Sequence, residues 1–445
     1  MNIIKPTFLL FSILLLNQLS FAQGSLNALS FDGKTKVVSP VVAHNIRNND
    51  FTFEAWVKPN TATGAQAILA NGTASPAIYT RTGSQLNGGK IGFFWHGTWF
   101  NTTSTATVGV WQHIAMVRQN GVITFYVNGV ANTTTFADAT RMNNAAITLG
   151  SSGNTNEFLN GSLDEVRVWS EARTVDQIRN NMCVRISTPV AALKSYWRFD
   201  EFQGTTSKDF SGNQSDLTAI SQQLRAASGA PIGDTCAYRF NTSQTKSIVV
   251  NSNQGNFTLQ NVGNVSAVFV YRVDTLPNSI SNLQGIGPNR TYFGVFTVGG
   301  TLNTNGLSFN YNAFPQAAAE HASLKLFERT NNETPSWTEG TSTNDTVRNI
   351  FINVGNYTTK EFFLAGFSNI ITPPPACLAP TNLVADMVKE FSARLDWTAG
   401  NSGIYMVEYG PTGFTPGTGA KINNITQKPY VLNGLQSNTA YDVYL

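Results

Sequence analysis

Apolar and polar residues alternate along several short segments in the first part of the chain, which is the pattern of half-buried β-strands. The clearest segment is 51–59, where the pattern has a period of two and Pro59 ends it. Further strands of this kind are expected at 28–33, 91–99, 111–118, 122–127 and 147–150. Many short strands joined by turns predict an all-β chain built from antiparallel β-sandwiches.

One stretch departs from this pattern and predicts a short helix. Residues 161–169 read as a strand that leads directly into it. Thr174 and Gln177 have the spacing of a capping box. The apolar residues after the cap fall on one helical face: Val175, Ile178 and Met182. The helix is therefore expected to begin just after Thr174.

Composition narrows the class of protein. Charged residues make up 12% of the 445 residues, against roughly 25% in an average soluble protein. Apolar residues reach 41%, which is enough for hydrophobic cores in about two to four domains. The net charge of +3 comes without a cluster of Lys or Arg, so no nucleic-acid partner is expected.

Residues 1–22 have the features of a secretory signal peptide. Lys5 precedes a short apolar core at 8–16, and Ser20 to Ala22 form a small-x-small cleavage site. The apolar core is shorter than the about 20 residues that span a bilayer, and no later segment is long enough. We therefore expect an exported protein, secreted or at the cell surface, without a membrane span.

The order of several motifs carries a family resemblance. ALSFDG, FTFEAWVKP, WQHIAMVR, FYVNG and GSLDEVRVWSEARTVDQI follow one another from residue 28 to 178. Together they resemble the laminin-G-like, concanavalin A-like jelly-roll family, and LKSYWRFDEFQGTTSKD resembles the segment that often flanks it. The resemblance implies a domain over 23–220 with two antiparallel sheets packed face to face. Such domains occur in carbohydrate-binding, adhesive and scaffold modules, and some polysaccharide-cleaving enzymes share the fold.

The rest of the chain divides into three parts. Residues 231–369 are strand-rich, and they fit either a diverged second jelly roll or an unrelated β-sandwich. Residues 370–377 are a Pro-rich linker. Residues 378–445 resemble a fibronectin type III domain, with Trp397 in its core and Tyr441 against the preceding turn. The sequence stops inside a strand of that family, so we expect it to be part of a longer gene product.

The resemblance also implies a calcium site. In related domains, an Asp at the position of Asp164 is a ligand, and Asp32 lies in the turn that would meet it. Calcium takes about six to eight oxygen ligands from carboxylates and carbonyls on loops. The ion would be structural. In the alternative, Asp164 binds backbone amides with no metal.

Aromatic residues mark the candidate sugar site. Trp95 and Trp99, with His96 between them, are the densest aromatic group, and Tyr79 and Arg81 are candidates to lie nearby. Flat rings with polar neighbours suit a saccharide. The alternative is that these rings belong to the sandwich core.

No arrangement in the sequence predicts catalysis. Glycoside cleavage needs two carboxylates facing each other. Asp164 and Glu165 are adjacent, so a regular strand points them to opposite faces. His113 lies in a strand that the family keeps for its core, so a structural role is expected.

Three cysteines are present: Cys183, Cys236 and Cys377. The resemblance at the C-terminal end implies that the partner of Cys377 would follow residue 445. This leaves a disulfide between Cys183 and Cys236, which export permits, or two free thiols.

These observations favour an exported, non-catalytic protein whose jelly roll binds a glycan or an extracellular protein. The alternatives are the accessory part of a polysaccharide-degrading enzyme and a purely structural surface protein.

Overall fold

The computed structural model is almost entirely β-structure, and it describes most of the chain. The described residues are 4–5, 24–40, 50–71, 77–83, 86–95, 98–137, 146–151, 157–201, 205–218, 225–240, 247–252, 255–260, 265–287, 289–312, 320–367, 381–398, 405–414, 419–425 and 427–445. They fall into two compact units, residues 20–370 and residues 371–445 together with 1–19. The predicted linker at 370–377 lies outside the described residues.

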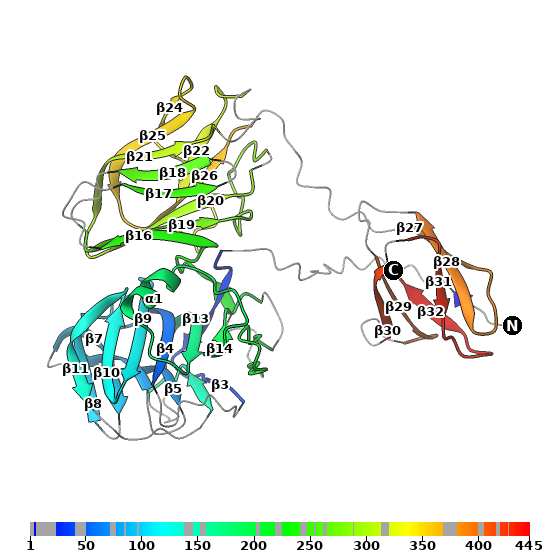
Figure 1. Ribbon diagram of the computed structural model, residues 1–445, viewed down its shortest axis with the longest axis horizontal. Helices are drawn as coiled ribbons and strands as arrows, with labels where there is room; N and C mark the ends of the chain where they lie inside the picture. Colours follow the sequence, from blue (N-terminus) through cyan, green and yellow to red (C-terminus); the bar gives the residue numbers. More distant parts are fainter. Residues whose placement is uncertain are drawn as a thin grey trace. The chain divides into compact units, whose positions relative to one another are not determined.

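The first sandwich consists of two facing antiparallel sheets (Figure 1). The eight-stranded sheet has the order β11 (Val130–Ala137), β10 (Val122–Val127), β9 (Gln112–Gln119), β4 (Phe51–Pro59), β13 (Asn160–Trp169), β2 (Asn27–Asp32) and β15 (Arg225–Ala227), and β14 (Leu193–Trp197) also pairs with β13. The six-stranded sheet has the order β3 (Val37–Val38), β12 (Ile147–Leu149), β5 (Ala65–Asn71), β6 (Ala77–Gly83), β7 (Leu86–Trp95) and β8 (Thr98–Thr105). The fold class predicted from the alternation is confirmed.

The central strand β4 is buried on both faces. Phe51, Phe53, Ala55 and Val57 point into the core between the two sheets. The intervening residues were expected to meet solvent, but Trp56 lies in a second apolar cluster on the outer face. The alternation therefore predicted the strand correctly. It did not predict the second apolar cluster, which covers the outer face of β4.

The helix α1 (Val175–Asn181) begins where the sequence predicts. Thr174 accepts a hydrogen bond from the backbone N–H of Gln177, whose side chain accepts one from the N–H of Thr174, so the capping box is confirmed. Ile178 packs on Ala115 and Val117 of β9. The helix thus covers part of the outer face of the eight-stranded sheet.

Residues 235–365 form a second β-sandwich. One sheet has the order β16 (Thr235–Phe240), β19 (Ala267–Val273), β20 (Tyr292–Val298), β26 (Lys360–Ala365), β22 (Lys325–Arg329) and β23 (Thr338–Glu339). The other has the order β17 (Ile248–Ser252), β18 (Gly255–Gln260), β21 (Leu302–Asn310), β25 (Ile350–Tyr357) and β24 (Thr343–Asp345). Aromatic rings fill the space between them, with Phe257 stacked on Phe293 at 5.1 Å.

The two sandwiches share a buried apolar cluster. The cluster contains Ala28, Trp56, Trp111, Met182, Cys183, Ala230, Ile232, Ala267, Phe269 and Phe296. The Trp56 ring meets the Phe296 ring edge-on at 5.3 Å, and its Nε1 donates to the Met182 carbonyl at 2.6 Å. Across the same junction, Glu333 Oε1 accepts from Lys58 Nζ at 2.6 Å and from Trp111 Nε1 at 2.9 Å.

Within the boundary expected at 220–231, the described residues 225–231 are packed against the sandwiches. Strand β15 pairs with β2, and Ser228, Ala230 and Ile232 are all buried. This connection is part of the packed structure, which makes residues 20–370 one unit.

The second unit is a smaller pair of sheets. One has the order β27 (Thr381–Asp386), β28 (Ser392–Thr398) and β31 (Tyr430–Asn433), and the other has the order β1 (Ile4–Lys5), β32 (Tyr441–Tyr444), β29 (Tyr405–Pro411) and β30 (Ala420–Ile425). Trp397 is buried in its core, and the Tyr441 hydroxyl accepts from the Gln436 N–H at 2.9 Å, so both local contacts lie where the sequence places them.

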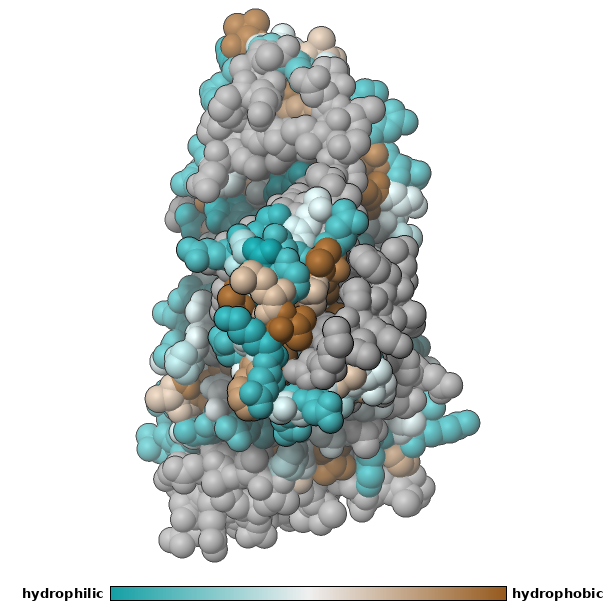
Figure 2. All heavy atoms as spheres, turned by 90° about the vertical axis from the view of Figure 1, so that its right-hand side faces the viewer, coloured by the Kyte–Doolittle hydropathy of each residue, from teal (hydrophilic) through white to brown (hydrophobic). Residues whose placement is uncertain are grey.

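The described surface in Figure 2 is largely hydrophilic, with hydrophobic atoms in smaller patches. In the described part of residues 381–445, the large apolar residues that are half exposed or more are Val384, Met387 and Phe391. No helix in the described part of the chain is long and apolar enough to cross a membrane.

Candidate functional site

The predicted sugar-binding residues lie on three neighbouring strands of the six-stranded sheet. Tyr79 and Arg81 belong to β6, Trp95 ends β7 and Trp99 belongs to β8. Their backbones are described, whereas their side chains and His96 lie outside the described residues. The structure thus brings the four positions to adjacent strands, and their role in binding stays a prediction.

The strand expected at 91–99 is two strands. Trp95 pairs with Thr98, and Phe94 pairs with Trp99, so the chain reverses direction between the two tryptophans. The expectation that both lie along one strand was wrong, because β7 ends at Trp95 and pairs antiparallel with β8, which begins at Thr98.

Asp32 caps a turn at the exposed end of β2. Its Oδ1 accepts hydrogen bonds from the backbone N–H groups of Lys34 and Thr35, at 2.9 and 3.0 Å, and from the Thr35 hydroxyl at 2.9 Å. The Lys34 hydrogen bond is the main cause that lowers the pKa of Asp32. These contacts account for Asp32 as a residue that stabilises its own turn.

Asp164 is buried and bound to protein donors. Its Oδ2 accepts from the hydroxyls of Ser228, at 2.6 Å, and Ser25, and its Oδ1 accepts from the Glu165 N–H at 2.7 Å. Burial raises the pKa of Asp164, and the charges of Glu165 and Asp200 raise it further. The side chain is therefore held as a hydrogen-bonded group, as the alternative without metal describes.

The two Asp residues are not brought together. Asp32 pairs with Asn160 of β13, and Asp164 lies four residues further along that strand. At about 3.3 Å per residue, the Cα atom of Asp164 is roughly 13 Å along the strand from the Cα atom of Asn160. Calcium ligands lie about 2.3–2.6 Å from the ion, so the pair cannot share one. In the described part of the chain, no three His, Cys, Asp or Glu side chains cluster as a metal site would require. These residues do not fit the calcium site that the resemblance implied.

A β-bulge changes the geometry of the Asp164–Glu165 pair. The register between β13 and β4 shifts between Asp164 and Arg167, and Glu165 has a left-handed φ of 50°. The strand is therefore not regular where the prediction assumed a regular one, and both residues are at most 2% exposed. Glu165 binds Arg167 Nη2 at 2.6 Å and accepts from the Tyr196 hydroxyl. Neither carboxylate can reach a substrate in solution.

Arg167 fastens the segment that follows α1. It donates to the Asn181 carbonyl at 2.9 Å and to the Val184 carbonyl at 2.8 Å. With Glu165 and Tyr196 it forms a buried hydrogen-bonded network. Removing one partner of a buried ion pair destabilises the fold, because the charge of the other partner is left uncompensated.

His113 is a structural residue, as expected. It is buried beside Trp56, and its Nε2 lies 3.3 Å from Glu54 Oε2. Burial lowers the pKa of His113 and keeps the imidazole neutral. Burial alone would raise the pKa of Glu54, but the His113 hydrogen bond and the nearby Arg167 and Arg173 lower it.

Cys183 and Cys236 are neighbours in the apolar cluster between the sandwiches. The structure holds both as free thiols, so the predicted disulfide is not formed in it, although the two predicted partners lie together. Burial, and then the hydrogen bond to Cys236, raise the pKa of the Cys183 thiol. A protonated thiol is a poor nucleophile, which is a physical reason for slow oxidation.

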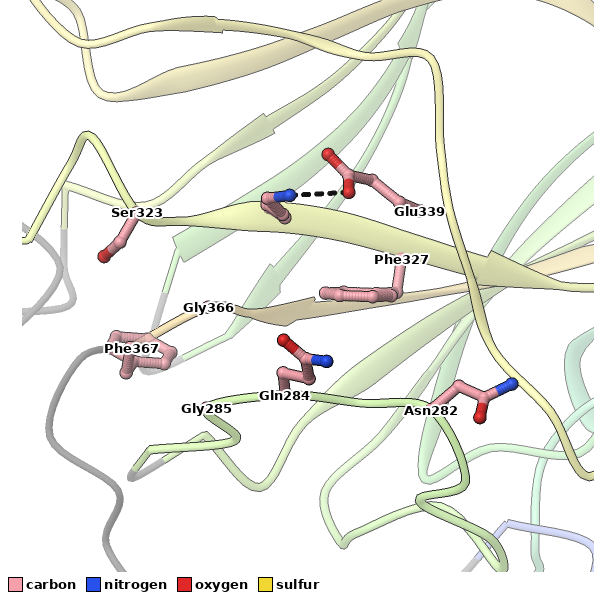
Figure 3. Close-up of a pocket in the computed structure, with 9 residues that line it drawn as sticks. Asn282, Gln284, Gly285, Ser323, Phe327, Glu339, Gly366 and Phe367 are labelled. Atoms are coloured by element: carbon pink, nitrogen blue, oxygen red, sulfur yellow. Dashed lines mark hydrogen bonds and ion pairs between the residues drawn. The ribbon is translucent and has the colours of Figure 1, made fainter.

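A pocket of about 560 Å³ lies in the second sandwich, where the sequence predicted no site (Figure 3). Its walls are the loop at 282–285, the first residues of β22, Glu339 of β23 and Gly366 with Phe367 after β26. Four separate segments build it, so no local motif could have revealed it. In this region, the glycines of SNLQGIG are the sequence signal for a turn.

Comparison with known proteins identifies the first sandwich. Residues 31–179 match the family model of the concanavalin A-like lectin/glucanase superfamily. The match ends there, so the fibronectin type III assignment of 378–445 stays a prediction.

Solved structures show distant likeness. A Bacteroides ovatus protein assigned to carbohydrate binding is 18% identical, with a TM-score of 0.39 over 48% of this chain and 62% of that one, less than two thirds of its length. Domain 4 of an extracellular arabinanase from Geobacillus stearothermophilus, in complex with arabinotriose, is 21% identical, with a TM-score of 0.29 over 34% and 74% of the two chains. The CBM40 of a Ruminococcus gnavus sialidase, bound to sialyllactose, is 13% identical, with a TM-score of 0.29 over 35% and 97%.

Because these TM-scores are all below 0.5, the similarities support no conclusion about the ligand or activity of this chain. The family match and the two facing antiparallel sheets agree on the architecture. Residues 31–179 therefore form a concanavalin A-like, laminin-G-like jelly-roll domain.

Proposed function

We propose that this is an exported, non-catalytic glycan-binding protein, whose jelly roll binds its ligand on the six-stranded sheet. The match of residues 31–179 to a lectin-containing family is the observation that carries this proposal. The signal-like residues 1–22 support export.

The packing favours one sheet over the other. The outer face of the eight-stranded sheet is covered at its central strands β4 and β9, since Trp56 packs on Phe296 and Ile178 packs on Val117. A ligand of the jelly roll then has the six-stranded sheet and its loops to bind. The candidate residues on β6, β7 and β8 belong to that sheet.

Burial of the acidic residues supports a role without catalysis. Glu54, Asp164 and Glu165 are all buried in the jelly roll. Glycoside cleavage needs two carboxylates that flank a bound sugar. None of the three faces solvent, and Asp164 and Glu165 are also hydrogen-bonded to protein donors.

A glycan array with the full chain tests this proposal. We expect binding to a defined set of glycans, and loss of it in Trp95→Ala and Tyr79→Ala. Phe391→Ala is the matched control, because it removes a half-exposed aromatic ring from the other compact unit.

Three outcomes would contradict the proposal. An array that stays blank with folded protein would remove glycan binding. Binding that persists at full strength in both jelly-roll variants would place the site elsewhere. Release of reducing sugar from a polysaccharide panel would overturn the absence of catalysis.

A further inference from the structure

The pocket in the second sandwich has a rigid frame. The Gly366 N–H lies 2.9 Å from the carbonyls of both Gln284 and Gly285, and the Phe367 N–H donates to Gly285 O at 2.9 Å. On the other side of the loop, the Trp337 N–H donates to Ser281 O at 3.0 Å. The loop is thus fastened at both ends by backbone hydrogen bonds. A site that is already in its final shape loses little entropy when a ligand binds.

Two glycines make this close approach feasible. Gly285 and Gly366 both have left-handed φ values, 61° and 95°. A Cβ on Gly285 would lie 2.2 Å from the Phe367 carbonyl oxygen, and a Cβ on Gly366 would lie 2.2 Å from the Ser323 carbonyl oxygen. Larger residues would push the loop off the end of β26, so the pocket depends on these positions.

The pocket offers balanced hydrogen-bonding groups around an aromatic ring. Figure 3 shows Gln284 pointing from the loop toward Phe327, with Glu339 on the opposite side of the ring. Lys325 Nζ binds Glu339 Oε2 at 2.7 Å, and both side chains remain about half exposed. Asn282 and Gln284 are exposed, and each amide carries both donors and acceptors.

These features define the chemistry of a ligand. The charges of Lys325 and Glu339 are paired and cancel, so the pocket carries no net charge that would attract an anion or a cation. A ligand hydroxyl both donates and accepts, which matches the two amides. The volume of about 560 Å³ falls within the about 300–1,000 Å³ of small-molecule sites.

We propose that this pocket binds a neutral, hydroxyl-rich ligand, a short saccharide chain, as a second glycan site of the protein. It extends the proposed glycan-binding function to the second sandwich. It does not depend on the jelly-roll site, because the two sites share no residue and lie on different sheets.

Calorimetric titration of the full chain with maltotriose, cellotriose and mannotriose tests this proposal, with trigalacturonic acid as the acidic probe. We expect at least one neutral probe to bind. The double variant Asn282→Ala/Gln284→Ala removes two neutral hydrogen-bonding groups and should weaken binding about tenfold. Gln260→Ala is the matched control, since Gln260 is an exposed amide on the other sheet.

A charge variant tests the neutral character of the ligand. Glu339→Gln leaves Lys325 without its partner, so the acidic probe should bind more tightly to this variant than to the wild type. The side chains of Gln260, Asn282, Gln284 and Glu339 are exposed, so we expect their variants to fold. The melting temperature of each variant checks this.

The outcomes separate this site from the jelly roll. Binding lost in the double variant and kept in Trp95→Ala supports the pocket. Binding kept in the double variant and lost in Trp95→Ala overturns the pocket and leaves the jelly-roll site standing. Failure of every neutral probe to bind the wild type, or equal binding of the acidic probe, also overturns this proposal.

Discussion

Replacing Trp56 by Ala should destabilise both sandwiches of residues 20–370 at once. The ring is fully buried, meets Phe296 at 5.3 Å and His113 at 5.4 Å, and donates to the Met182 carbonyl. It thus contacts the jelly roll, the segment after α1 and the second sandwich.

The size of the effect follows from the burial. Truncating a buried Trp to Ala costs about 3–5 kcal/mol of unfolding free energy. The Met182 carbonyl also loses its donor, which adds roughly 1 kcal/mol. A total of about 5 kcal/mol lowers Tm by roughly 10–20 °C, at about 2–4 °C per kcal/mol.

Differential scanning calorimetry of the full chain is the assay. Trp397→Ala should shift only the transition of the C-terminal unit, since Trp397 lies in that unit's core, and this assigns the peaks. The remaining transition should stay single in Trp56→Ala and move as a whole. Phe296→Ala should move the same transition, and the double variant should cost less than the sum of the single ones.

Separable behaviour would refute this reasoning. If the two sandwiches melt in two transitions, with Trp56→Ala moving one and Phe296→Ala the other, the cluster does not couple them. Additive effects of the two substitutions would lead to the same conclusion.

Three further predictions concern buried groups. Burial raises the pKa of Asp164, so the folded state holds a proton that the unfolded chain releases, and the unfolding free energy should fall as pH rises from about 4; urea titrations should show a flatter fall in Asp164→Asn, and an equal slope would refute this. Any rise of Tm with calcium should persist in Asp164→Asn, because both carboxylate oxygens already bind protein donors; a rise that disappears would restore the calcium site. Mild oxidation of the folded protein should join Cys183 to Cys236 slowly, and peptide mapping that finds Cys377 bonded to either would contradict their placement.

The sequence predicted elements whose signals are local. The period-two pattern identified β4, and the Thr174–Gln177 spacing identified the start of α1, because neighbours in the chain determine both. The order of motifs identified the jelly roll, which the family match confirms.

Features that depend on distant residues could not be predicted in this way. The outer face of β4 is covered by Phe296, far along the chain, so Trp56 looked like a residue of a half-exposed strand. The bulge at Glu165 breaks the alternation on which the assignment of the two carboxylates rested. The pocket joins residues 284, 325 and 366, which no spacing rule connects.

Glycan binding by the folded full chain tests the central claim most directly, with wild type, Trp95→Ala and Asn282→Ala/Gln284→Ala compared on one array. We predict that the wild type binds and that each variant loses a different part of the binding. A blank array from wild-type protein with the expected melting transitions would contradict the claim.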